Sequence, residues 1–187
     1  MRIISGKYKS RSLEAPPGLA TRPTSDRLRE TLFNVLAPRI EGAAFLDLYA
    51  GSGAVGLEAL SRGAGSVTWV ERSPVALKAL RGNLARLGTE GNFRVHAESV
   101  RAFLRSAQPE AFDLVFLDPP YDAAQEYETA LDLLSAPAGI LAPHAVVIAE
   151  HRRKQKLPDA YGELKRTRLL EQGDAALSFY ALQTPAP

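Results

Sequence analysis

The sequence predicts a doubly wound α/β fold, in which a mostly parallel sheet carries helices on both faces. From residue 44 onward, short apolar runs alternate with helical stretches of about ten to fifteen residues, which is typical of βαβ units. A Gly-rich turn follows the first apolar run, and the last two strand-like runs, 162–173 and 175–183, are joined by a short turn. A short connection requires antiparallel pairing, so we expect a C-terminal hairpin at the edge of a seven-stranded sheet.

An arm precedes this alternating region. Strand-like runs at 2–5 and 11–15 are joined through Gly-Lys-Tyr-Lys, and Pro-Pro-Gly then interrupts the chain. These features predict a short basic β-arm over residues 1–23. Residues 24–187 then form the main domain, because a chain of 187 residues most simply holds one domain.

The first helix is expected after Pro23, because a proline disfavours helical backbone in the residue before it. Thr24 or Ser25 can cap this helix, and the apolar residues that follow recur every three or four positions. The pattern predicts an amphipathic helix that ends near Pro38.

The alternating region itself contains five predicted strands and four predicted helices. The strands are expected at 44–50, 66–71, 93–99, 112–118 and 144–150. The helices are expected at 54–63, 74–88, 100–107 and 123–136. Because the run 112–118 is the most completely apolar, we expect it near the centre of the sheet.

Composition excludes several classes of protein. With 45% hydrophobic and 24% charged residues, the chain is neither collagen-like nor disordered. The absence of cysteine rules out a disulfide scaffold, a Cys-based zinc site and a thiol nucleophile, and three scattered histidines argue against a His-rich metal centre. The sequence shows neither the apolar segment of a signal peptide nor a long apolar run. We therefore expect a cytoplasmic protein without a bound metal.

Charge is distributed unevenly along the chain. Residues 1–40 and 151–168 each carry a net charge of +5, whereas residues 41–150 carry −6. An acidic centre between two basic flanks suggests a polyanionic partner that meets the flanks, with ordinary solvated faces as the alternative. His151 opens the second basic stretch and is expected at the surface.

The Gly-rich turn points to a nucleoside cofactor. Gly51, Gly53 and Gly56 satisfy the pattern G-x-G-x-x-G, which alone is a weak signal. Glu71 ends the next predicted strand, where a carboxylate can accept both hydroxyls of a ribose. Asp47, four residues before the first glycine, would repel a pyrophosphate but suits a ligand with an ammonium and a sulfonium group. This combination favours S-adenosylmethionine over NAD.

A second unusual strand end is Asp118-Pro119-Pro120-Tyr121. The carboxylate, the backbone stiffened by two prolines and the aromatic ring would form a rigid polar clamp beside a stacking platform. A strand-terminating turn is the alternative, because Asp-Pro is common in turns.

These motifs carry a resemblance to a known family. Residues 47–56, Glu71 and residues 118–121, with the terminal hairpin, resemble class I S-adenosylmethionine-dependent methyltransferases, and the DPPY form resembles those that methylate exocyclic amines of nucleobases. A narrower resemblance covers nearly the whole chain, to the bacterial 16S ribosomal RNA guanine-N2 methyltransferases of the small subunit. It is carried by the segments 2–16, 18–34, 47–64 and 115–121. The resemblance implies a Rossmann-like methyltransferase fold.

The candidate site residues fall into three groups. The cofactor-binding candidates are Asp47, Tyr49, Ala50, Gly51, Ser52, Gly53, Glu71, Arg72, Glu98, Ser99 and Val100, together with Arg22 and Thr24. The catalytic candidates are Asp118, Pro119, Pro120 and Tyr121. The candidates for RNA binding are Lys7, Lys9, Arg11, Arg152, Arg153, Lys154 and Lys156.

Alternatives remain for several of these residues and for Trp69. Arg22 and Thr24 fall in the most specific segment and can close over cofactor or RNA, or serve as a solvated charge and a helix cap. Tyr49 and Trp69 alternate with core residues, which favours packing for both. Where many relatives place Asp or Asn after the third strand, this chain has Glu98-Ser99, so the contact to the cofactor adenine falls to Ser99 or to a backbone amide.

The implied chemistry is methyl transfer to the N2 amine of a guanine in 16S ribosomal RNA, either naked or in an assembling small subunit, by a monomer. Asp118 and the Pro119 carbonyl would each accept one N–H of the amine, and Tyr121 would stack on the base.

Alternatives are a DNA adenine-N6 methyltransferase, which usually has a separate recognition domain, and a protein-glutamine methyltransferase, which typically has Asn at position 118. A nicotinamide-dependent oxidoreductase is a less favoured alternative, because Asp47 would repel the pyrophosphate of its cofactor. A non-catalytic RNA-binding module is the last alternative.

Overall fold

The computed structural model describes residues 1–16, 25–89, 91–106, 112–120, 124–136 and 139–183. Its strands are β1 (Ala44–Leu48), β2 (Ser66–Val70), β3 (Asn92–His96), β4 (Phe112–Leu117), β5 (Leu141–Arg152), β6 (Ala160–Tyr161), β7 (Leu164–Gln172) and β8 (Ala175–Leu182). Its helices are α1 (Asp26–Ile40), α2 (Ala54–Ser61), α3 (Pro74–Leu87), α4 (Val100–Ser106) and α5 (Ala124–Leu134).

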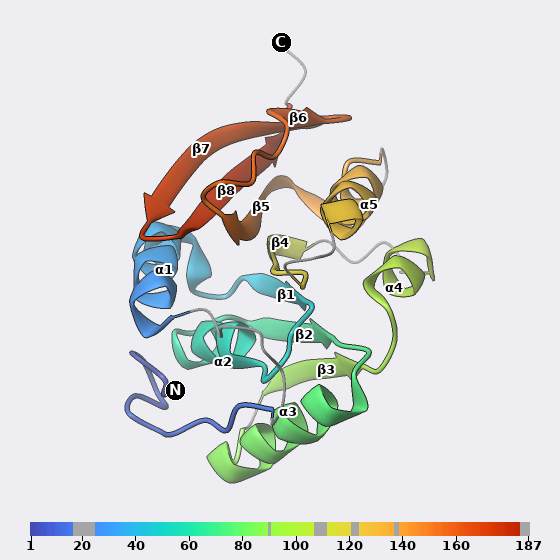
Figure 1. The fold of residues 1–187 in the computed structure, drawn as a ribbon. Coiled ribbons are helices and arrows are strands. Elements are labelled where there is room, and N and C mark those ends of the chain that lie inside the picture. Colours follow the sequence, from blue (N-terminus) through green and yellow to red (C-terminus); the bar gives the residue numbers. More distant parts are fainter. Residues whose placement is uncertain (17–24, 90, 107–111, 121–123, 137–138, 184–187) are drawn as a thin grey trace.

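All of these strands join one sheet in the order β3-β2-β1-β4-β5-β8-β7-β6 (Figure 1). Strands β1 to β5 pair in parallel, and β8 continues the sheet antiparallel to β5. The predicted doubly wound sheet and C-terminal hairpin are therefore confirmed, and β4 lies near the centre as expected. The order reverses between β1 and β4, which is the switch point where ligands bind in such sheets.

The sheet differs from the prediction in its strand count. The two-residue strand β6 pairs only with the beginning of β7 and makes the sheet eight-stranded. Two residues are too few to produce a period in the sequence, so no pattern could reveal this strand. Strand β5 also begins at Leu141 rather than near residue 144.

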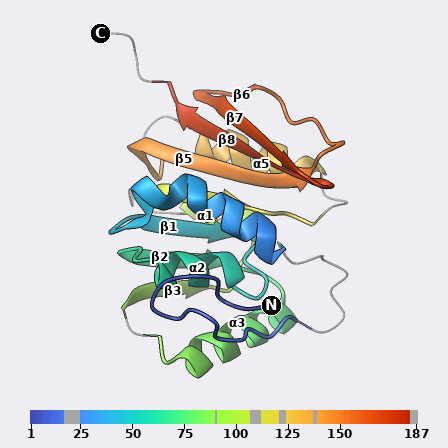
Figure 2. The same cartoon turned by 90° about the vertical axis from the view of Figure 1, so that its left-hand side faces the viewer.

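Helices cover both faces of the sheet. One core cluster contains side chains of α1, α2 and α3, and the other contains side chains of α4 and α5. Figure 2 shows α1 and α2 lying across the first of these faces. Phe45 on β1, Phe116 on β4 and Ile148 on β5 all belong to the first cluster, whereas Leu117 and Ala149 belong to the second. This alternation decides which strand-end residues share a face.

Helix α1 begins as predicted and ends slightly later. The Ser25 side chain accepts a hydrogen bond from the backbone N–H of Leu28, which caps the helix. The helix continues past Pro38 to Ile40. Ile40 is buried in the core, and this burial holds the last turn against the sheet although Pro38 donates no hydrogen bond.

The arm forms less β structure than predicted. Its two expected strands are reduced to one isolated antiparallel bridge, between Arg2 and Ser12. The reason is that part of its backbone pairs with α2 instead. The fully buried carboxylate of Glu58 accepts hydrogen bonds of 2.8 and 3.0 Å from the backbone N–H groups of Ile4 and Ser5.

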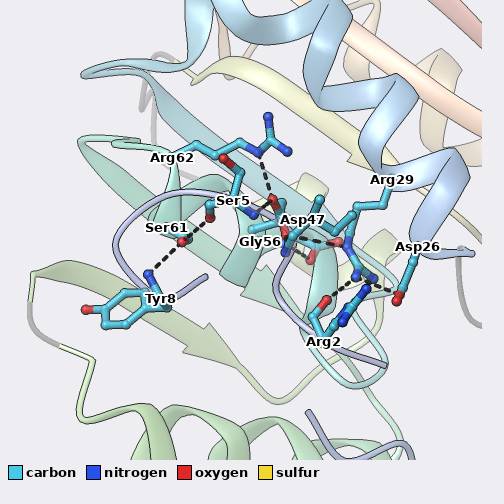
Figure 3. A network of polar contacts seen from close by, with 11 residues as sticks. Arg2, Ser5, Tyr8, Asp26, Arg29, Asp47, Gly56, Ser61 and Arg62 are labelled. Atoms are coloured by element: carbon cyan, nitrogen blue, oxygen red, sulfur yellow. Dashed lines mark hydrogen bonds and ion pairs between the residues drawn. The ribbon is translucent and has the colours of Figure 1, made fainter. Parts of the chain in front are cut away.

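Glu58 also connects the arm to α1. The Nε of the fully buried Arg29 lies 3.7 Å from a carboxylate oxygen of Glu58. The same guanidinium donates to the carboxylate of Asp26 and to the backbone carbonyl of Arg2 (Figure 3). Arm, α1 and α2 are thus joined by one buried polar network.

Within the described part of the chain, no helix is both long and apolar enough to cross a membrane.

Candidate active site

A cavity of about 380 Å³ opens at the carboxyl ends of β1, β2, β3 and β4, at the switch point of the sheet. Most of the cofactor-binding and catalytic candidates line it. These are Asp47, Tyr49, Ala50, Gly51, Ser52, Glu71, Arg72, Glu98, Ser99, Val100, Asp118 and Pro120. The tertiary structure therefore brings four separate strand ends, one of them the Gly-rich turn, together around one volume that suits a nucleoside ligand.

Two of the cofactor-binding and catalytic candidates that the structure describes are not part of the cavity wall. Gly53 is the N-cap of α2 and Pro119 is buried, and neither lines the cavity. Arg22, Thr24 and Tyr121 fall outside the described residues. Ala15 and Pro16 of the arm reach the cavity wall, which the sequence did not suggest.

The three glycines of the turn have different roles. Gly51 and Gly53 have positive φ angles of 56° and 78°, which favour glycine. A Cβ on Gly53 would lie 2.1 Å from the Leu80 side chain, so a residue without a side chain at this position allows the turn to pack against α3. A Cβ on Gly56 would lie 2.2 Å from the Trp69 indole nitrogen. Gly56 therefore permits close packing of helix on strand, and Trp69 is a core residue as predicted.

Glu71 is held at the rim of the cavity by backbone groups. Its Oε2 accepts a hydrogen bond of 2.8 Å from the N–H of Gly51, and its Oε1 accepts one of 2.7 Å from the N–H of Ser73. A carboxylate oxygen can accept more than one hydrogen bond, so this oriented group retains acceptor capacity for ribose hydroxyls.

Asp47 is buried and oriented by α2. Its Oδ2 accepts a hydrogen bond of 2.8 Å from the backbone N–H of Gly56. Burial raises the pKa of this carboxyl to about 8, with a further rise from the Glu71 carboxylate, although the hydrogen bond from Gly56 opposes the shift. A cationic ligand in the cavity would favour the ionised form of Asp47 and so lower this pKa.

Asp118 directly follows β4, between β1 and β5. Burial raises the pKa of its carboxyl well above the usual value, and the carboxylates of Glu150 and Asp47 raise it further. The register pairs Leu117 with Ala149, so Asp118, directly after β4, and Glu150, within β5, lie at the same level on neighbouring strands. Sequence reasoning missed Glu150, although an acidic residue at the end of an apolar strand is the signal that had identified Asp47 and Asp118.

Tyr49 is more than a packing residue. Its φ of 60° is unusual for a side chain other than glycine. Its hydroxyl donates a hydrogen bond of 2.9 Å to Oε2 of Glu126, in the first turn of α5, and both residues line the cavity. Burial, followed by the Glu126 carboxylate, raises the pKa of the Tyr49 hydroxyl, so it remains a donor. The sequence carried no signal for Glu126, because its partner is 77 positions away.

The basic candidates divide into two groups. Lys7, Lys9 and Arg11 are exposed on the arm, but the backbone N–H of Lys7 donates to the carbonyl of Ser61, at the end of α2 remote from the cavity. The exposed residues 152–154 and Lys156 instead lie at the end of β5 and directly after it, at the same edge of the sheet as Asp118.

The expectation for His151 was wrong. This residue is buried, because β5 extends to Arg152 and its end pairs with β8. The His151 Nε2 lies 2.9 Å from the hydroxyl oxygen of Ser178, and burial lowers the pKa of the imidazole.

Comparison with known proteins identifies a family and several relatives that resemble this chain. The family model described as "Conserved hypothetical protein 95" matches residues 1–181. "Ribosomal RNA small subunit methyltransferase D" of Escherichia coli K12 is 39% identical over 180 residues, which span 96% of this chain and 89% of the relative. "Putative rRNA methyltransferase YlbH" of Bacillus subtilis is 37% identical over 96% of this chain and 98% of its own. A solved structure, "Putative methyltransferase yhhF from Escherichia coli", superposes with a TM-score of 0.85 at 38% identity, covering 98% of both chains.

Proposed function

The chain belongs to the family described as conserved hypothetical protein 95, and from this premise we propose that it methylates the N2 amine of a guanine in 16S ribosomal RNA of the small subunit, using S-adenosylmethionine. The observation that carries the proposal is the convergence of two carboxylates, Asp47 and Asp118, on one cavity at the switch point. The first suits a cationic cofactor and the second suits an amine that becomes positively charged during methyl transfer.

The cavity fits S-adenosylmethionine through three groups. Glu71 is oriented to accept the ribose hydroxyls, and the open turn at Gly51 allows a ligand to approach the backbone. Asp47 is positioned to favour the ammonium and sulfonium charges. Glu98 and Ser99, after β3, line the cavity where an adenine contact is expected.

When bound, S-adenosylmethionine supplies an electrophilic methyl group. The work of this chain is to prepare the guanine amine, whose lone pair is delocalised into the ring and is therefore poorly nucleophilic. The carboxylate of Asp118, which lines the cavity, accepts an N–H of the amine, and this favours a tetrahedral nitrogen with its lone pair directed at the methyl group. As positive charge develops on this nitrogen, the carboxylate of Asp118 stabilises it, and the raised pKa of Asp118 suits it to accept the proton that the amine then loses.

The RNA would contact basic groups at the same edge of the sheet. Residues 152–154 and Lys156 support this part of the proposal by their position, and the arm residues Lys7, Lys9 and Arg11 would extend the surface beyond α2. Because ribosomal RNA is the proposed substrate, we place the protein in the cytoplasm. We propose that it acts as a monomer, since residues of one chain suffice to form the cavity.

A methyl-transfer assay tests the proposal. Labelled S-adenosylmethionine is incubated with naked 16S RNA, with partly assembled small subunits and with duplex DNA that contains adenine targets. We expect label in N2-methylguanine of the RNA and none in the DNA. Label in N6-methyladenine of the DNA would favour the adenine methyltransferase, and binding of RNA without transfer to any substrate would favour a non-catalytic module.

A further inference from the structure

Glu126 lies over the end of β4, where Asp118 follows. The hydroxyl of Tyr49, directly after β1, donates to its carboxylate. The next residue, Tyr127, donates a hydrogen bond of 2.7 Å from its hydroxyl to the carbonyl of Glu150 on β5. Because β4 lies between β1 and β5 in the sheet, this first turn of α5 spans the end of β4.

This position separates Glu126 from the cofactor-binding carboxylates. Glu71 follows β2 and Glu98 follows β3, on the other side of β1 from Asp118. Glu126 and Asp118 line the same cavity on the β4 side, where the target amine is expected. A second carboxylate therefore faces the volume that receives the base.

The chemistry of the guanine edge explains what a second carboxylate can do. Guanine presents two adjacent donors, the C2 amine and N1–H, whereas adenine presents an acceptor at N1. A carboxylate accepts from N1–H but repels a ring nitrogen with a lone pair, so it discriminates between the two edges in both directions.

We propose that Glu126 accepts the N1–H of the target guanine while Asp118 holds its C2 amine, so that Glu126 determines the choice of base. This inference rests on the proposed function. The Tyr49 hydroxyl acts as a positioning group, because its hydrogen bond to Oε2 fixes the rotamer of Glu126. The carboxylate has the capacity to accept the base donor in addition to this hydrogen bond.

The experiment compares guanine with 2-aminopurine at the target position of an otherwise identical RNA. 2-Aminopurine keeps the C2 amine but presents an acceptor at N1, so the reacting group is retained. In single-turnover methyl transfer, we expect wild-type protein to prefer guanine by about 10- to 100-fold beyond any intrinsic difference in reactivity. Glu126→Gln can donate to the N1 acceptor through its amide, and it should reduce this preference at least about tenfold. Its affinity for S-adenosylmethionine should stay unchanged.

Two further variants control the comparison. Glu128→Gln changes an exposed carboxylate two residues along α5 that does not line the cavity, and it should keep the wild-type preference. Tyr49→Phe removes only the hydroxyl and should lose part of the preference.

An equal loss of rate on both RNAs in Glu126→Gln, with the preference retained, would mean that Glu126 is structural and would overturn the inference while the proposed function stands. A fall in cofactor affinity with the preference retained would overturn it too. No transfer to guanine by wild-type protein would remove the proposed function and this inference together.

Discussion

The backbone N–H of Gly51 donates a 2.8 Å hydrogen bond to Oε2 of Glu71, across the switch-point cavity's rim. The two residues belong to different strand ends, because Gly51 lies in the turn after β1 and Glu71 directly follows β2. One contact thus fixes both the shape of the glycine turn and the orientation of the carboxylate that is proposed to bind ribose.

We expect Glu71→Ala to weaken S-adenosylmethionine binding by about 1.5–3 kcal/mol, the scale of hydrogen bonds to a charged group. Glu71→Gln should lose less, because an amide oxygen still accepts a hydrogen bond. Calorimetric titration measures both affinities, and RNA affinity serves as the control that should not change. Cofactor affinity unaltered in Glu71→Ala would remove this residue from the cofactor site.

Asp47 makes cofactor binding depend on pH. Its pKa of about 8 in the free protein means that the carboxyl is mostly protonated at pH 7, and a cationic ligand favours the ionised form. Binding should therefore release protons, and affinity should rise as the pH is raised toward about 8. Titration calorimetry in buffers of different ionisation enthalpy measures the protons released. Asp47→Asn should release fewer, and an identical proton release in this variant would contradict the assignment.

The same carboxyl affects stability with a definite sign. In the unfolded chain an aspartate has a pKa of about 4, so between about pH 4 and pH 8 the native state binds a proton that the unfolded state has lost. The contribution of Asp47 to the free energy of unfolding should fall as pH rises through this window. Urea denaturation over the same range should show a smaller decline for Asp47→Asn than for the wild-type protein.

Asp118→Ala should reduce the rate of methyl transfer at least about 100-fold, the scale of losing one well-placed electrostatic contact. Asp118→Asn should retain more activity, because its amide oxygen accepts one N–H without the charge. Affinities for cofactor and RNA should survive in both variants, since the loss belongs to the transition state. A near-normal single-turnover rate in Asp118→Ala would reduce this residue to a turn former.

The two basic groups can be compared directly. Reversing the charges of residues 152–154 and Lys156 should raise the Kd for RNA and flatten its salt dependence by about 0.7–0.9 per lost phosphate contact. Reversing Lys7, Lys9 and Arg11 should do the same to a smaller extent, because the arm is anchored toward the far end of α2. Filter binding at several salt concentrations measures both slopes. Slopes equal to that of wild-type protein would show that these residues are only solvated.

Glu58 should be a major determinant of stability. Glu58→Ala removes the buried carboxylate that accepts from the arm backbone and faces Arg29, and breaking a buried pair costs about 3–5 kcal/mol. Urea denaturation measures the loss, and Glu41→Ala, an exposed carboxylate at the end of α1, is the matched control. A loss as small as that of the control would mean that the arm is held mainly by apolar contacts.

The sequence by itself determined the elements and the motifs, because both are encoded over short distances. The cap at Ser25, the helix from Pro74 and the alternation of apolar runs from residue 44 depend on neighbours within one or two turns. The glycine turn and Asp118-Pro119-Pro120 are likewise local, since glycine and proline act on their own backbone. The position of motifs at strand ends was sufficient to predict that Asp47, Glu71 and Asp118 would share one edge.

Only the tertiary structure decided which side chains meet across that edge and which polar residues are buried. The hydrogen bond from Tyr49 to Glu126 joins residues 77 positions apart, and those from Ile4 and Ser5 to Glu58 join residues 54 and 53 positions apart. Nor could the sequence show that the end of β5 is enclosed by β8, which buries His151. The physical reason is that burial and pairing over such separations depend on how whole elements pack. The hydrophobic period of a strand (two residues) or a helix (3.6 residues) shows which face is buried but does not identify the residue that this face contacts.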